Sequence, residues 1–143
     1  MSINSDSVPA RSEGGERPGR EGSGRTVLIV EDEMIIRELL SRVFRQAGYA
    51  VIEAGSPEDA FGAVRGQRHR VDLLVSDIGL PGSSGFEVFG ELRRSNVGMR
   101  AVFISGSARE SLPGVGELPA GAVFLEKPFE SSTLLAAVRG LME

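Results

Sequence analysis

The sequence predicts an α/β fold built on a five-stranded parallel sheet with helices on both faces. Short apolar runs alternate with helical segments from Arg25 to the end of the chain, and this alternation is typical of a doubly wound sheet with right-handed crossovers. The first run is apolar throughout, which indicates a strand that is covered on both faces. Three of the runs end in charged residues, at the strand ends where such sheets bind their ligands.

Five strands and four amphipathic helices are predicted in alternation. The strands span 26–30, 49–54, 71–76, 101–104 and 122–125, and the helices span about 32–47, 56–64, 84–92 and 129–141. Ser56 and Pro57 are typical of a helix start. The first helix carries a wide apolar stripe that we expect to face the sheet. Its members are Ile35, Ile36, Leu39, Leu40, Val43 and Phe44.

The segment between the fourth and fifth strands departs from this pattern. Residues 107–121 contain three glycines and two prolines, and both residue types disfavour a helix interior. The helix expected between these two strands, the fourth of the fold, is therefore predicted to be shortened, with helical turns only near 108–112.

A polar segment precedes the first strand. Residues 1–24 hold almost no large apolar side chain, so they cannot bury enough surface to offset the entropy lost on ordering. We expect a disordered N-terminal tail over 1–24 and one globular domain over 25–143. A chain of 143 residues is long enough for one well-packed core.

The composition excludes several classes of function. Without cysteine the chain cannot form disulfides, thiolate zinc sites or a thiol nucleophile, and its one histidine cannot build an imidazole cluster. A net charge of −4 gives no electrostatic footprint for nucleic acid. No apolar stretch approaches the roughly 20 residues that span a bilayer, and the N-terminus lacks a signal peptide's apolar core. We therefore expect a cytoplasmic protein without direct nucleic-acid or membrane contacts.

Charged residues end three of the predicted strands. Glu31 and Asp32 follow the first strand, Asp77 follows the third, and Lys127 follows the fifth. Carboxylates rarely end a buried strand without a function, because an unpaired buried charge is costly. If the strands are parallel neighbours, these groups meet at one edge of the sheet. That arrangement suits a divalent cation and a phosphoryl group.

Together these residues resemble the receiver domain of response regulators. The motifs that carry the resemblance are Glu31-Asp32-Glu33, the segment Ser-Asp-Ile-Gly-Leu-Pro-Gly at 76–82, Ser105, and Lys127-Pro128-Phe129. They match the family in order and spacing over about 25–143. The resemblance implies a flavodoxin-like sheet with strand order 2-1-3-4-5.

The resemblance also implies a phosphoacceptor and a metal site. Asp77 is the expected acceptor, because a positioned carboxylate can attack phosphorus in line and form an acyl phosphate. Asp32, supported by Glu31, is expected to hold Mg²⁺ together with Asp77 and the carbonyl oxygen of Gly79, since Mg²⁺ prefers hard oxygen ligands. A negative charge at Asp32 would also interact favourably with the positive N-terminal end of the following helix.

Three further residues have implied roles. Lys127 is expected to place a compact positive charge on the transferring oxygens, in a family where the Lys127–Pro128 bond is cis. Ser105 is expected to donate its hydroxyl to a phosphate oxygen. Phe124 matches the family's switch aromatic, and it also fits simple core packing on a strand.

The expected function is that of a stand-alone phosphoacceptor in a two-component phosphorelay. A sensor histidine kinase or a histidine phosphotransfer protein would supply the phosphoryl group. Phosphorylation would change the face formed by the fourth strand, the segment after it and the fifth strand, which an unknown downstream protein would bind. The chain is not expected to be an enzyme beyond self-phosphorylation and autodephosphorylation.

Three alternatives stay open on the residues alone. A hydrolase of the haloacid dehalogenase type places a second aspartate two residues after its nucleophile, where this chain has Gly79. A flavodoxin-like nucleotide binder needs a Ser/Thr/Gly-rich phosphate loop, where this chain has acids. A degenerate receiver used as a docking module would not need the full set of acids, Ser105 and Lys127.

Overall fold

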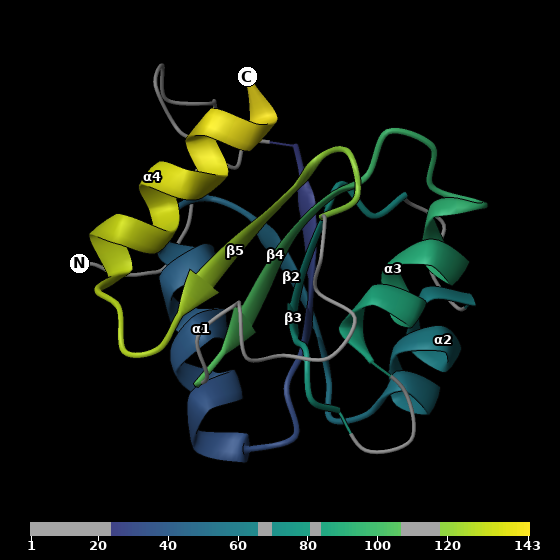
Figure 1. The fold of residues 1–143 in the computed structure, drawn as a ribbon, viewed down its shortest axis with the longest axis horizontal. Coiled ribbons are helices and arrows are strands. Elements are labelled where there is room, and N and C mark those ends of the chain that lie inside the picture. Colours follow the sequence, from purple (N-terminus) through teal and green to yellow (C-terminus); the bar gives the residue numbers. More distant parts are fainter. Residues whose placement is uncertain (1–23, 66–69, 81–83, 107–117) are drawn as a thin grey trace.

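The computed structural model describes residues 24–65, 70–80, 84–106 and 118–143. Five strands and four helices follow one another within these ranges (Figure 1). They are β1 (Thr26–Val30), α1 (Met34–Gln46), β2 (Ala50–Ala54), α2 (Pro57–Arg65), β3 (Leu73–Asp77), α3 (Gly85–Arg93), β4 (Arg100–Ser105), β5 (Ala122–Glu126) and α4 (Ser131–Met142).

The sheet has the predicted topology. Its strand order is β2-β1-β3-β4-β5, and every neighbouring pair is parallel. α1 and α4 cover one face, while α2 and α3 cover the other (Figure 1). All five strands therefore end at the same edge, and the switch in strand order lies between β1 and β3, where such sheets bind ligands.

The core consists of two apolar layers, one on each face of the sheet. Under α2 and α3, Ala60, Val88, Phe89 and Leu92 pack on Phe103 of β4 and its neighbours. The second layer, under α1 and α4, is built around a set of fully or almost fully buried side chains. They include Leu40, Phe44, Leu134 and Val138. β1, β3 and β4 contribute side chains to both layers, so the strands that carry the acids are packed on both faces.

Two helices begin with polar caps, and the cap at Ser56 is the predicted one. The Ser56 hydroxyl accepts a hydrogen bond from the Asp59 amide at 3.1 Å at the start of α2. At α3, Ser84 and Glu87 form a reciprocal capping box, in which each side chain accepts from the other residue's amide. α1 has Glu33 at its N-cap position, and that side chain makes no capping bond.

Part of the predicted α1 stripe is wrong. Leu40 and Phe44 are buried, but Ile35 is 70% exposed and Leu39 is 53% exposed. At 3.6 residues per turn, Ile35 and Leu39 lie roughly 140° and 100° around the helix from Leu40. They therefore project away from the strip that meets the sheet. Met34, the first residue of α1, is also exposed, at 59%.

Other predictions fall outside the described residues. These are the shortened helix near 108–112 and the tail up to residue 23. Element bounds otherwise differ from the prediction by one or two residues, so that Asp77 is the last residue of β3. Among the described helices, none has both the length and the apolarity that a bilayer crossing requires.

Candidate functional site

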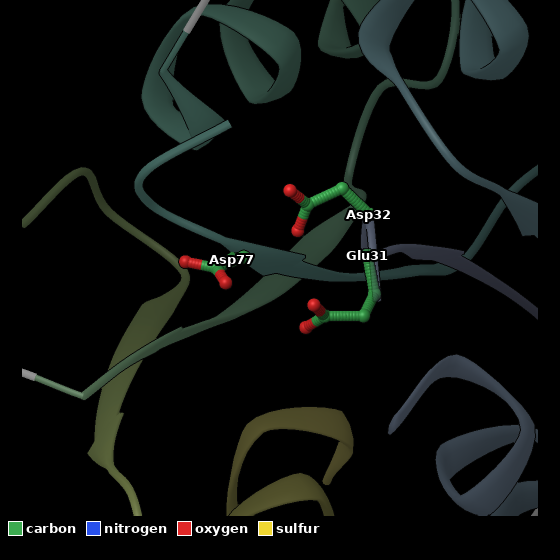
Figure 2. Close-up of side chains that lie close together, drawn as sticks. All are labelled: Glu31, Asp32 and Asp77. Carbon is green, nitrogen blue, oxygen red and sulfur yellow. The ribbon is translucent and has the colours of Figure 1, made fainter. Parts of the chain in front are cut away.

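Three carboxylates meet at the edge of the sheet where the strands end. Glu31 and Asp32 follow β1, and Asp77 ends the neighbouring strand β3. One carboxylate oxygen from each residue lies within 4.8 Å of the others, and Figure 2 shows the three side chains around a common space. The expected convergence of these acids is therefore present.

Lys127 brings a positive charge to the same place. Its Nζ lies 3.5 Å from Asp77 Oδ2 and 3.8 Å from Glu31 Oε1. The residue follows β5, and its amide donates to the carbonyl oxygen of Ser105 at 2.7 Å. The Lys127–Pro128 peptide bond is cis. Lys127 is the one lysine among the 16 Lys and Arg residues of the chain, so the compact ammonium group occurs at this site alone.

Glu31 is the buried member of the cluster, with 1% of its surface exposed. Burial raises the pKa of its carboxyl group. The hydrogen bond from the Glu33 amide to Oε2, at 3.1 Å, and the charge of Lys127 lower that pKa in part, while Asp77 and Asp32 raise it further. A bound cation would relieve the unfavourable burial of this charge.

Asp77 is held in place by its neighbours in the chain. Its Oδ1 accepts from the Gly79 amide at 3.0 Å, and its carbonyl oxygen accepts from the Ser76 hydroxyl at 2.9 Å. Gly85, the first residue of α3, packs so closely that a Cβ there would lie 2.8 Å from the Asp77 carbonyl oxygen. Sequence reasoning missed Ser76 and Gly85, because their roles depend on how α3 meets the end of β3.

Ser105 and Phe124 lie on the two strands beyond the acids. Ser105 ends β4, is buried, and stands opposite Glu126 in the sheet register. Phe124 lies opposite Phe103 and packs, partly buried, against the core layer under α2 and α3. The core-packing interpretation of Phe124 therefore holds. The Gly79 residue is exposed beside Asp77.

One basic residue near the acids was not predicted. Arg37 Nη1 donates to the carbonyl oxygen of Glu31 at 2.7 Å, and Arg37 Nε lies 3.6 Å from Glu53 Oε1. An arginine within a helix is ordinarily solvated, so nothing in the local sequence marks it. Its spacing from the acid motif, in the second turn of the helix that follows, is the one available signal.

The donor set fits a magnesium ion. Carboxylate oxygens are hard ligands, and Mg²⁺ in proteins is commonly held by one or two carboxylates plus water and phosphate oxygens. Asp32 is exposed and Asp77 half-buried, so a phosphate group can approach the cluster from solvent. Lys127 lies on the Glu31–Asp77 side, where it can share the charge of a bound phosphoryl group.

Comparison with known proteins identifies the family. Residues 27–139 match the response regulator receiver domain. The chain is 30% identical over 121 residues to the uncharacterized transcriptional regulatory protein YbdJ of Bacillus subtilis, covering 84% of this chain and 52% of that protein. It is 33% identical over 138 residues to the sensor kinase CckA of Brucella abortus, covering 95% of this chain and 14% of the kinase. The chain thus spans about half of the first relative and a small part of the second.

Solved structures agree. The receiver domain of the hybrid histidine kinase CckA superposes with a TM-score of 0.69 at 30% identity, over 82% of this chain and 99% of that one. The response regulator TrrA of Thermotoga maritima, in complex with Mg²⁺ and BeF, gives 0.67 at 28% identity, over 82% and 98%. With its strand order, its edge of acids and these relatives, the chain belongs to the response regulator receiver family, the phosphoacceptor domains of two-component signalling.

Proposed function

We propose that Asp77 accepts the phosphoryl group, with Mg²⁺ held by Asp32, Glu31, Asp77 and the carbonyl oxygen of Gly79. The observation that carries the proposal is the meeting of three carboxylates within 4.8 Å with Lys127 Nζ 3.5 Å from Asp77. The phosphoryl donor would be a phosphohistidine of a sensor histidine kinase or a histidine phosphotransfer protein.

The transfer itself is a displacement at phosphorus. An oxygen of the ionised Asp77 carboxylate attacks in line, the new O–P bond forms as the P–N bond to histidine breaks, and the bonding electron pair stays on the imidazole nitrogen. A bound Mg²⁺ would supply charge neutralisation and orientation of the phosphoryl oxygens. The Gly79 amide and Ser76 hydroxyl hold Asp77 ready for this attack.

Lys127 and Ser105 would complete the charge balance around the product. The ammonium group of Lys127 already lies between two of the acids, so it can pair with a phosphate oxygen once one arrives. Ser105 ends the strand next to β3, where its hydroxyl can turn toward the acyl phosphate. Phe124, partly buried on the next strand, would then move inward and change the surface over β4, β5 and the segment that joins them.

Such a shift would be the output of the domain. The two arrangements exist in equilibrium, and phosphorylation favours the one with the better contacts to the phosphate. A downstream protein would bind the altered surface, without direct nucleic-acid contact by this domain. Substrate turnover is not expected, because Gly79 stands where a hydrolase of the haloacid dehalogenase type needs its acid–base aspartate. The assembled acids and Lys127 argue against a degenerate docking module.

The test uses a small-molecule donor. We expect acetyl phosphate with Mg²⁺ to give a hydroxylamine-sensitive phosphoryl adduct, seen by intact mass, and chelation of Mg²⁺ to abolish it. Asp77→Asn removes the nucleophile at constant shape and should give no adduct, while Asp59→Asn, an exposed acid at the start of α2, should react normally. An adduct that forms on Asp77→Asn at the normal rate would disprove the assignment.

A further inference from the structure

Arg37 links three parts of the molecule around the acid cluster. From the second turn of α1 its Nη1 donates to the Glu31 carbonyl oxygen at 2.7 Å, while its Nε lies 3.6 Å from Glu53 of the edge strand β2. The side chain is only 20% exposed. The guanidinium group therefore lies against the chain directly behind the acids instead of extending into solvent.

The bond to Glu31 acts on the peptide that carries both metal-binding side chains. The Glu31 amide donates to Ala54 at 3.0 Å, and its side chain accepts from Glu33. Arg37 holds the remaining polar group, the carbonyl oxygen, and so fixes the plane of the peptide between Glu31 and Asp32. Because both Cα atoms belong to that peptide, its plane is one determinant of where the two carboxylates point.

Position 55 leaves room for this contact. A Cβ on Gly55, just after β2, would lie 3.2 Å from Arg37 Nη1, which is the nitrogen that bonds to Glu31. That is closer than an ordinary van der Waals contact, so a larger residue would press the guanidinium group away from the carbonyl oxygen. The loop after β2 is thus shaped to admit Arg37.

We propose that Arg37 is a positioning residue for the magnesium site: it fixes the Glu31–Asp32 peptide so that the acids stand ready for the ion. The inference rests on the proposed function. Residues that hydrogen-bond to metal ligands and so orient them commonly cost about 10–100-fold in metal affinity when they are replaced. Arg37 belongs to that class, although it touches a ligand's main chain instead of its carboxylate.

The charge of Arg37 and its hydrogen bond to Glu31 predict opposite effects on Mg²⁺ affinity when the residue is replaced. A nearby cation repels Mg²⁺, so loss of the charge alone would tighten metal binding. Loss of the bond to Glu31 would loosen the peptide and weaken metal binding. Glu53, paired with the guanidinium group, offsets much of the repulsion, so we expect the positioning effect to dominate.

The experiment is a Mg²⁺ titration of amide NMR shifts on the full chain, without any phosphoryl donor. We expect Arg37→Gln to bind Mg²⁺ about tenfold more weakly than wild type. Arg37→Lys keeps the charge but lacks the guanidinium group that contacts Glu31 and Glu53 at once, so its Mg²⁺ binding should be weakened similarly. Before metal is added, the amides of Asp32 and Glu33 should already be shifted in Arg37→Lys, which keeps the positive charge, so a purely electrostatic role would not explain that shift.

Arg45→Gln is the matched control. Arg45 lies two turns further along α1, and its Nη2 is 3.4 Å from the same Glu53 carboxylate. The variant removes a cation and an ion pair from the same helix, yet should leave Mg²⁺ affinity within about twofold of wild type. Gly55→Ala offers a second route to the same contact and should weaken Mg²⁺ binding less than Arg37→Gln. If thermal unfolding without Mg²⁺ shows that Arg37→Gln is not folded, the Mg²⁺ affinity of Gly55→Ala tests the inference in its place.

Each result has one meaning. Weaker binding in Arg37→Gln and Arg37→Lys, with Arg45→Gln unchanged, supports the inference. Tighter binding in Arg37→Gln with unchanged Arg37→Lys shows a charge effect only and overturns it, as do unchanged affinities throughout. Wild-type protein that binds Mg²⁺ but never becomes phosphorylated contradicts the proposed function alone, and wild-type protein that binds no Mg²⁺ contradicts both.

Discussion

At the scale of single residues, Glu31 has a buried carboxylate whose negative charge a bound cation would stabilise. Burial raises the pKa of this carboxyl group above its ordinary value despite the help of Glu33 and Lys127. A raised pKa means that the folded state favours the protonated form. Glu31 therefore contributes stability to the folded state only while it is protonated. This contribution is complete at pH values below the ordinary glutamate pKa, and it is lost as the pH rises through the raised pKa.

The first prediction concerns Glu31→Gln, which removes this charge at constant shape. In Mg²⁺-free buffer at about pH 7 the variant should unfold at a higher temperature than wild type, and the difference should shrink as the pH falls toward about 4. Added Mg²⁺ should reverse the order, because a metal at 100 times its Kd stabilises wild type by about 2.7 kcal/mol. Thermal unfolding by circular dichroism measures both effects. Glu33→Gln, an exposed neighbour, should show neither.

The second prediction concerns Lys127, whose ammonium group lies 3.5 Å from Asp77. Lys127→Gln should slow phosphorylation by acetyl phosphate about 100-fold, as the loss of one preorganised charge does at comparable sites. Mg²⁺ binding should be retained or tightened, since a competing cation is gone. Lys127→Arg should not restore the rate, because a planar guanidinium group does not replace a compact ammonium. Equal rates in all three proteins would remove Lys127 from the mechanism.

At the scale of elements, α1 shows what periodicity can and cannot decide. Its spacing of apolar residues correctly predicts a helix, and Leu40 and Phe44 face the sheet as expected. The same spacing wrongly assigns Ile35 and Leu39 to the core, because an apolar stripe wider than the contact with the sheet looks continuous in sequence. The exposed remainder, Ile35 and Leu39, begins two residues after the acid motif. That position suits a surface against which a phosphoryl donor protein can approach Asp77.

The third prediction tests this surface with Leu39→Asp. The variant should react with acetyl phosphate as wild type does, since the acid cluster is untouched. Transfer from a phosphohistidine protein should slow about tenfold, the effect of losing one significant interface side chain. Val97→Asp is the control, because Val97 is 75% exposed and lies before β4, at the other end of the strands. Equal slowing by the two variants would indicate a general effect of added charge.

The residues missed in sequence share a physical reason. Charged residues at strand ends could be placed because parallel strands share an edge, so Glu31, Asp77 and Lys127 were predictable from one pattern. Arg37 and Gly85 contact main-chain atoms of other elements, and such contacts depend on how the helices pack on the sheet. A polar side chain in or after a helix carries no local sign of that role.

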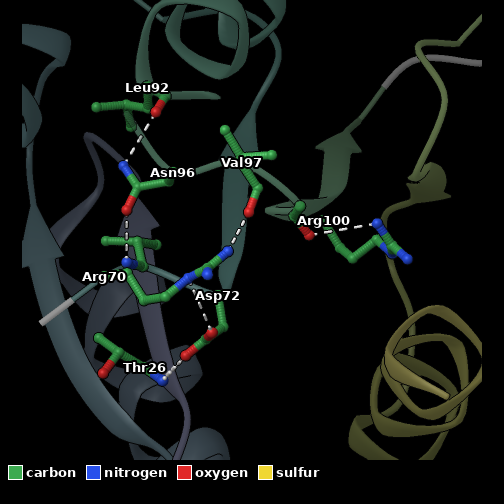
Figure 3. Close-up of polar contacts among 9 residues, drawn as sticks. Thr26, Arg70, Asp72, Leu92, Asn96, Val97 and Arg100 are labelled. Atoms are coloured by element: carbon green, nitrogen blue, oxygen red, sulfur yellow. Dashed lines mark hydrogen bonds and ion pairs between the residues drawn. The ribbon is translucent and has the colours of Figure 1, made fainter. Parts of the chain in front are cut away.

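At the scale of the whole molecule, a polar cluster closes the edge of the sheet opposite the acids (Figure 3). The side chain of Asn96, which is 4% exposed, accepts from the Val71 amide at 2.8 Å and donates to the Leu92 carbonyl oxygen at 3.0 Å. Asp72 accepts from the Thr26 amide at 2.9 Å. These bonds join the end of α3 to the chain entering β3 and to β1, and so hold together the two strands that carry the acids.

The fourth prediction is that Asn96→Ala destabilises the domain by about 2 kcal/mol, because the buried Val71 amide loses its hydrogen-bond partner, whereas the Leu92 carbonyl oxygen keeps the main-chain amides of Ser95 and Asn96. For a domain of this size the Tm should fall by about 5–10 °C. Phosphorylation at temperatures well below that Tm should be unchanged, since the cluster lies far from Asp77. Val97→Ala, at the exposed neighbouring position, should leave the Tm unaltered. A loss of phosphorylation without a loss of stability would show that the two edges are coupled.

Chemical trapping of the acyl phosphate shows which residue carries the phosphoryl group. Protein phosphorylated with acetyl phosphate and Mg²⁺ can be reduced with borohydride, which converts a phosphorylated aspartate to homoserine and leaves a stable mark for peptide mass spectrometry. We expect homoserine at position 77 and none when Mg²⁺ is chelated. Homoserine at another aspartate, or a mark that forms equally without Mg²⁺, would contradict this expectation.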